Sequence, residues 1–317
     1  MRIAVLGTGR MGAFRAEWLR AHPDVDEVLV GSIRAGTVEA ALDSAPDGVV
    51  IASATPDHVA QIHACAERGL PMLCEKPIAL TLAETRAALD VAGDRIQVAF
   101  ERRFDPGFAE ARRLVAEGAL GTLYSVRMVS FDHEPSPEHF IPGSGGIFRD
   151  MHIHDFDTAR WLTGREVEQA YAVGTVRRWE RFAKYGDADT SAIVLTMDDG
   201  LPVVVSGSRH DPRGYDCRAE LLGSDDSVAV GLNARTPLRA VDPTAPTPPS
   251  DPYTAFLDRY AAAFEGELRA WLEFVRGERE NPCPGDAAWH ALRVAVACDR
   301  SRATGRPVVV ASVTDGA

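Results

Sequence analysis

The chain has 317 residues and a mass of 34.2 kDa, more than one domain usually contains, so two domains are expected. Its 45% hydrophobic and 25% charged residues are typical of a soluble globular protein, and it lacks the roughly 20-residue apolar run of a membrane span. The net charge of −12 argues against a nucleic-acid partner. With no export signal, and with five scattered cysteines that form no CxxC pair, the sequence favours a cytoplasmic protein without a metal site.

The first element expected is a strand over residues 2–6, followed at once by a glycine-rich turn and a helix to residue 19. The turn reads Gly7-Thr8-Gly9-Arg10-Met11-Gly12, the GxGxxG fingerprint of dinucleotide-binding folds. In that fingerprint, Gly7 permits the tight turn, Gly9 lets the backbone approach a pyrophosphate, and Gly12 lets the helix pack on the strand. Residues 7–12, with Arg10 and Met11 among them, are therefore predicted to bind a dinucleotide.

The end of the second predicted strand, residues 27–30, carries information about the cofactor. An NAD enzyme usually places an acid about 20 residues beyond the last glycine, but this chain has Ser32 there and Arg34 two residues later. A missing carboxylate and an available guanidinium suit a 2′-phosphate, which favours NADP over NAD. The alternative is that Arg34 simply points to solvent.

Two further segments follow predicted strands of this sheet. Thr55-Pro56-Asp57-His58 begins a helix after the third strand, and Glu75-Lys76-Pro77 ends the fourth strand. Open α/β sheets bind ligands at the carboxyl ends of their strands, so Lys76 is a candidate functional lysine rather than an ordinary surface one. Residues 1–122 are accordingly expected to form a Rossmann domain.

Beyond residue 122 the pattern changes to short strands separated by turn signals, which predicts a second α/β domain with a largely antiparallel open sheet over residues 123–317. The expected strands cover residues 123–131, 167–176, 190–197, 202–209, 217–222 and 227–230. Single helices are expected over residues 256–277 and 285–304, with a last short strand at 307–311.

Residues 143–164, GSGGIFRDMHIHDFDTARWLTG, are the strongest candidate for a catalytic segment. As one continuous helix they would place Asp150, His154, Asp157 and Trp161 on one stripe about 60° wide, flanked by apolar residues. Ionisable groups among apolar ones carry shifted pKa values suited to proton transfer. The alternative is that Asp150 and His154 form an i,i+4 pair that satisfies itself inside the core.

These motifs together resemble the glucose-fructose oxidoreductase, inositol dehydrogenase and rhizopine catabolism (Gfo/Idh/MocA) family, in particular its inositol 2-dehydrogenase branch. The resemblance runs over nearly the whole chain and rests on GTGRMG at 7–12, TPDH at 55–58, CEKP at 74–77, RRFDP at 102–106, SGGIFRDMHIHDFD at 144–157 and RGYDCRAELLGS at 213–224.

The resemblance implies a nicotinamide-dependent dehydrogenase whose open sheet forms dimers or tetramers. It implies that His154 is the general base, that Asp150 orients it, and that Lys76 holds the reacting oxygen. Asp157 and Tyr215 would bind the substrate. The cofactor would contact the glycine-rich turn, Ser32 and Arg34, together with Thr55, Pro56, His58, Glu75 and Lys76.

The implied reaction is hydride transfer from a secondary ring hydroxyl of a cyclic polyol, such as an inositol, to NAD or NADP. The same residues would serve a sugar or aldose dehydrogenase, a sugar ketoreductase, or a lyase that oxidises its substrate transiently. A dinucleotide-binding sensor without turnover is the alternative from another class. Two departures from the family are a short segment between the second and third strands and the missing acid after strand two.

Overall fold

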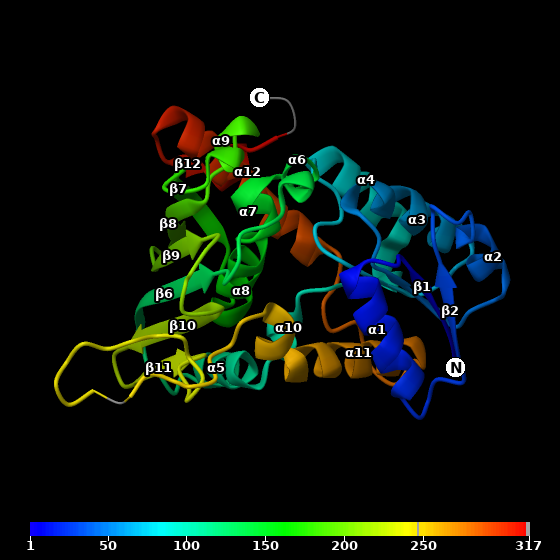
Figure 1. Ribbon diagram of the computed structural model, residues 1–317, viewed down its shortest axis with the longest axis horizontal. Helices are drawn as coiled ribbons and strands as arrows, with labels where there is room; N and C mark the ends of the chain where they lie inside the picture. Colours follow the sequence, from blue (N-terminus) through cyan, green and yellow to red (C-terminus); the bar gives the residue numbers. More distant parts are fainter. Residues whose placement is uncertain (246, 315–317) are drawn as a thin grey trace. The chain divides into compact units, whose positions relative to one another are not determined.

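The computed structural model describes residues 1–245 and 247–314, and the chain divides into two compact units (Figure 1). The first contains residues 1–101 and 264–292; the second contains residues 102–263 and the part that begins at residue 293. These units do not follow the single boundary expected at residue 122. Helix α5 (Pro106–Ala116) belongs to the second unit, where it packs on α8, and most of α11 (Ala261–Val275) belongs to the first.

The first unit is built on a five-stranded parallel sheet in the order β2-β1-β3-β4-β5. Its strands are β1 (Arg2–Leu6), β2 (Glu27–Gly31), β3 (Gly48–Ile51), β4 (Met72–Cys74) and β5 (Ile96–Val98). The intervening helices are α1 (Arg10–Ala21), α2 (Val38–Asp43), α3 (Thr55–Glu67) and α4 (Leu82–Ala92), with a 3-10 turn η1 (Gly93–Arg95). This is the predicted Rossmann arrangement.

The core of the first unit lies between its sheet and two helices that are far apart in the sequence. Helices α1 and α11 run beside each other (Figure 1), and both pack on the sheet. Trp271 of α11 is fully buried, and a side chain on Gly48 would come within 3.0 Å of its ring. Tight packing of this kind explains why a helix from the far end of the chain completes the first unit.

The second unit contains a seven-stranded sheet in the order β11-β10-β6-β9-β8-β7-β12. Its strands are β6 (Leu123–Phe131), β7 (Val167–Thr175), β8 (Thr190–Met197), β9 (Pro202–Ser208), β10 (Asp216–Gly223), β11 (Ser227–Val230) and β12 (Val308–Val309). Strands β6 and β9 run parallel and the other neighbouring pairs run antiparallel, which confirms the largely antiparallel sheet.

The remaining helical elements lie mostly between these strands. They are η2 (Glu101–Phe104), η3 (Glu138–Phe140), α6 (Ile141–Ser144), α7 (Gly146–Asp150), α8 (Ile153–Thr163), α9 (Glu180–Lys184), α10 (Phe256–Arg259), α12 (Asp286–Thr304) and η4 (Val310–Ser312). Burial alternates along β8 and β9, so one face of the sheet is covered and the other is open.

Two predicted helices are interrupted. The expected helix over residues 143–164 consists of α6, α7 and α8, with Gly145 in the left-handed region (φ 80°) and a turn at residues 151–152. The expected helix over residues 256–277 breaks at Tyr260, whose buried hydroxyl donates to the Cys217 sulfur at 2.8 Å.

Candidate active site

The glycine-rich turn of the first unit has the shape that a dinucleotide requires. Gly7 lies at φ +123°, and a side chain on it would come within 2.3 Å of the Ala52 carbonyl oxygen. A side chain on Gly12 would lie 2.1 Å from the Gly7 carbonyl oxygen, whereas one on Gly9 would meet nothing within 4 Å. The outer glycines are therefore required by the fold, and Gly9, the N-cap of α1, leaves open space for a pyrophosphate at the helix N-terminus.

The loop after β2 carries the residues expected to select the cofactor. The Ser32 backbone N–H donates to the Thr37 hydroxyl at 2.9 Å, which closes a tight loop, and Arg34 lies exposed on it. No carboxylate follows β2 within this loop, which runs through described residues 32–37.

The His58 side chain is buried among backbone carbonyls, whereas the sequence predicted that it contacts the cofactor. Its ring is buried and lies between two carbonyl oxygens, 2.9 Å from that of Pro77 and 3.3 Å from that of Ser53. Burial lowers the pKa of this imidazole, although both carbonyls oppose the shift. His58 therefore ties the turn after Lys76 to the end of β3. Thr55 and Pro56 begin α3 beside it.

Glu75, the residue before Lys76, belongs to a buried charge cluster. The Arg15 guanidinium lies 2.7 Å from the Glu75 carboxylate and 2.8 Å from that of Glu267 in α11. Burial raises the pKa of Glu267 to about 8 despite the attraction of Arg15. The pattern of charges in the sequence did not indicate this cluster, because its members come from three separate elements.

In the second unit, Asp150 and His154 lie on opposite sides of the break between α7 and α8. The Asp150 carboxylate accepts a hydrogen bond from the buried Arg209 guanidinium at 2.7 Å. Burial opposes the charge on Arg209, but Asp150, Asp132 and Asp187 raise its pKa above the ordinary value. The continuous helix predicted for residues 143–164 is interrupted at residues 151–152, so Asp150 lies on α7 whereas His154, Asp157 and Trp161 lie together on α8. His154 lies in the first turn of α8.

Asp157 and Tyr215 both lie in the second unit. The Asp157 carboxylate is buried and accepts two hydrogen bonds from Arg103, at 2.6 and 2.9 Å. A substrate hydroxyl would have to share this carboxylate with Arg103, so the binding role of Asp157 stays a prediction. The Tyr215 ring stands at 80° to that of Tyr260, with 6.3 Å between the ring centroids.

Several residues of this region were missed by the sequence reasoning: Arg102, Arg103, His152, Asp155 and Arg209. The one local signal was the i,i+3 spacing of His152 and Asp155, which places both side chains on one side of a helix. The arginines are 50 or more positions away from their acidic partners, so no local pattern could pair them.

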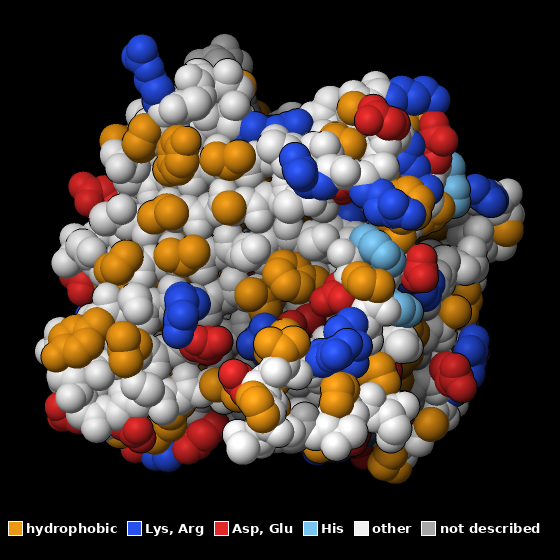
Figure 2. Space-filling model, turned by 60° about the vertical axis from the view of Figure 1, so that its left-hand side comes forward, with side chains coloured by type: hydrophobic (Ala, Val, Ile, Leu, Met, Phe, Trp, Pro, Cys, Tyr) orange, Lys and Arg blue, Asp and Glu red, His pale blue; other side chains and the backbone are white. Residues whose placement is uncertain are grey.

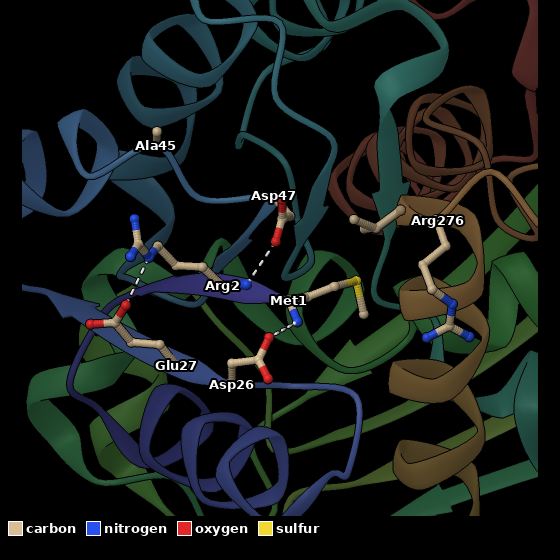
Figure 3. Close-up of a pocket in the computed structure, with 8 residues that line it drawn as sticks. Met1, Arg2, Asp26, Glu27, Ala45, Asp47 and Arg276 are labelled. Carbon is tan, nitrogen blue, oxygen red and sulfur yellow. Dashed lines mark hydrogen bonds and ion pairs between the residues drawn. The ribbon is translucent and has the colours of Figure 1, made fainter.

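The pocket shown in Figure 3 is a different place in the first unit. It holds about 570 Å³ and lies where β1, β2 and β3 begin, at the opposite edge of the sheet from the glycine-rich turn. Most of its charged groups pair with each other: the N-terminal amine with Asp26, Arg2 with Glu27, and the Arg2 backbone N–H with Asp47. Open α/β sheets bind their ligands at the other edge, so this pocket is not the candidate site.

Comparison with known proteins agrees with this geometry. Residues 30–100 match the family model "Oxidoreductase family, NAD-binding Rossmann fold", and residues 108–229 match the "GFO/IDH/MocA C-terminal domain". This chain belongs to the GFO/IDH/MocA oxidoreductase family. The predicted family and fold class are confirmed, and the chain is an oxidoreductase with an NAD-binding Rossmann fold.

Relatives match over nearly the full length. The chain is 33% identical to the uncharacterized oxidoreductase YrbE of Bacillus subtilis, over 96% of this chain and 95% of that protein. It is 35% identical to myo-inositol dehydrogenase Hyg17 of Streptomyces leeuwenhoekii, over 96% and 98% of the two chains. The crystal structure of a myo-inositol dehydrogenase from Corynebacterium glutamicum is 34% identical, with a TM-score of 0.87 and 98% of each chain covered.

Within residues 1–245 and 247–314 no helix is long and apolar enough to cross a membrane. Nor does this part of the chain contain a group of three or more His, Cys, Asp or Glu side chains that could hold a metal ion.

Proposed function

We propose that this protein is a nicotinamide-dependent dehydrogenase that oxidises a secondary ring hydroxyl of a cyclic polyol, with an inositol as the favoured substrate. The observation that carries the proposal is the fixed carboxylate of Asp150. Asp150 lies four residues before His154, at the end of α7, and its carboxylate is held by a hydrogen bond from the buried Arg209. The full-length similarity to proteins named myo-inositol dehydrogenase supports the choice of substrate.

In this proposal His154 takes the proton of the reacting hydroxyl. An imidazole suits that task because it accepts a proton near neutral pH. Asp150 orients His154 and favours the imidazolium that forms, while Lys76 stabilises the negative charge that develops on the substrate oxygen. Asp157 and Tyr215 are assigned to the substrate's other groups.

The residues of the first unit fit a dinucleotide. Gly7, Gly9 and Gly12 would hold its pyrophosphate at the N-terminus of α1, and the nicotinamide would supply the hydride acceptor. For the adenosine end we propose a preference for NADP over NAD, supported by the exposed Arg34 and by Ser32 at the position where an acid would select NAD.

We also propose that the protein forms a homo-oligomer through the open face of its second sheet. Large apolar side chains are exposed along four of its strands, including Tyr124, Tyr171, Val194 and Val204. Figure 2, turned so that the left-hand side of Figure 1 comes forward, shows hydrophobic side chains spread over this side of the molecule. Such a face is typical of a surface that a partner covers. A cytoplasmic location is proposed because all five cysteines are buried free thiols.

The test is a cofactor-reduction assay with NAD and NADP in parallel, against inositol isomers and common aldoses. Turnover on an inositol by the wild type, with at least a 10³-fold loss in His154→Ala and little change in cofactor binding, is the expected result. Turnover on aldoses alone would keep the chemistry and replace the substrate. Near wild-type turnover in His154→Ala would refute the assignment of the base. No turnover on any compound, with the cofactor still bound, would favour the sensor.

A further inference from the structure

A buried polar network lies under the first turn of α8. The imidazole of His152, the N-cap residue, is fully buried, and its Nδ1 lies 2.7 Å from the Asp155 carboxylate at position N3 of the same helix. Its Nε2 lies 2.7 Å from the Ser191 hydroxyl on β8. Because a carboxylate only accepts hydrogen bonds, Nδ1 carries a hydrogen and donates it to Asp155.

The acid of this network is anchored a second time. The Asp155 carboxylate accepts hydrogen bonds from the Arg102 guanidinium at 2.5 Å and from the Ser130 hydroxyl at 2.8 Å. Burial opposes ionisation of Asp155, but the positive charge of Arg102 and the bond from His152 outweigh it and lower its pKa. The carboxylate is thus ionised and held from three sides.

The sheet beneath is shaped to receive these two side chains. Ser130, Gly207 and Ser191 are register partners on β6, β9 and β8 and form one row across the sheet. Asp155 bonds to the serine at one end of the row and His152 to the serine at the other. Between them, a side chain on Gly207 would lie only 2.2 Å from the His152 Nε2 atom, so the glycine leaves the space that the imidazole fills.

His154 lies between the two anchored residues. The first turn of α8 begins at Ile153, directly after the N-cap His152, and contains His154 and Asp155, so the backbone that carries His154 is fixed on both sides. Two aromatic rings pack near the imidazole of His152. Phe148 precedes it in the chain and Phe156 follows it, and each ring centroid lies 6.1 Å from that of His152. Rigid support of this kind is what a general base needs for a defined geometry.

We propose that His152 is a positioning residue that sets the orientation of His154 through its bond to Asp155. The kinetic test of this inference rests on the proposed function, whereas its NMR test does not. The network places its constraint on the backbone of α8 and does not touch the reacting atoms.

Two substitutions at residue 152 separate its two hydrogen bonds. The Asn side-chain nitrogen occupies nearly the position of a histidine Nδ1, so His152→Asn keeps the donor to Asp155 and loses Ser191. Gln reaches nearer to the Nε2 position, so His152→Gln keeps Ser191 and loses Asp155. Arg160→Gln is the control, since it removes the ion pair with the exposed Glu166 at the other end of the same helix.

The experiment measures kcat, KM and cofactor affinity for the full chain and its variants. The expected result is a ten- to hundred-fold fall in kcat for His152→Gln with KM and cofactor affinity within threefold. His152→Asn should recover most of kcat, and Arg160→Gln should stay within twofold of the wild type. A His152→Gln enzyme as active as the control, or an Asn variant as impaired as the Gln variant, would overturn the proposal.

A second readout needs no substrate. The NMR signals of the His154 imidazole, assigned with His154→Gln, should be a single set in the wild type and in His152→Asn, and shifted or multiple in His152→Gln. Unchanged signals in His152→Gln would overturn the proposal even if no polyol is turned over. If the wild type turned over no polyol, the proposed function would be refuted, but the positioning role of His152 would still be tested by the NMR signals.

Discussion

Replacing Glu267 by glutamine should make the stability of the first unit less dependent on pH. Burial raises the pKa of this carboxyl group from 4.5 to about 8, so it holds its proton at neutral pH and Arg15 keeps Glu75 as its charged partner. Between these two values the folded protein binds a proton that the unfolded chain does not. Wild-type stability therefore falls as the pH rises through this window.

The magnitude follows from the width of the window. Each pH unit between 4.5 and about 8 costs the wild type about 1.4 kcal/mol of unfolding free energy, so the whole window amounts to about 5 kcal/mol as an upper limit. Glutamine resembles the protonated acid in shape and cannot ionise. The E267Q protein should match the wild type near pH 4.5 and exceed it by an amount that grows up to pH 8.

Urea unfolding at pH 5, 6, 7 and 8 measures the difference, and hydrogen exchange in peptides of α11 restricts the readout to the first unit. Glu265→Gln is the matched control, because Glu265 lies on the same helix in an exposed pair with Arg269. A difference between E267Q and the wild type that stays constant from pH 5 to 8 would refute the reasoning, as would a variant that is less stable at pH 8.

Four further substitutions test the sites. Arg34→Ala should weaken NADP binding at least tenfold and NAD binding less than twofold in titration calorimetry; equal losses would remove its role. Gly12→Ala should lower the melting temperature by several degrees, because its side chain would lie 2.1 Å from the Gly7 carbonyl oxygen, whereas Gly9→Ala should weaken cofactor binding with the melting temperature nearly unchanged. Arg209→Gln should reduce kcat at least tenfold, since it leaves Asp150 without its 2.7 Å guanidinium partner; full activity would show that Asp150 needs no such support.

Much of the first unit could be read from local patterns. The glycine-rich turn at residues 7–12 stands between a strand and a helix because backbone conformation and close packing there admit only glycine at Gly7 and Gly12. The Thr81 cap marks the beginning of α4 in the same local way, as the Asp105 cap does for α5 in the second unit. Family membership also followed from short motifs, because each is a contiguous set of residues.

The arrangement around the candidate base was decided by tertiary contacts. A 3.6-residue pattern continues through residues 143–164, yet the chain turns at residues 151–152. At that turn the His152 side chain packs against Ser191 and Gly207 on two neighbouring strands, 39 and 55 residues later in the chain. Asp150, Asp155 and Asp157 are each held by an arginine far away in the chain. Periodicity reports which face of an element is apolar, but the partner of a buried charge depends on the fold that brings distant residues together.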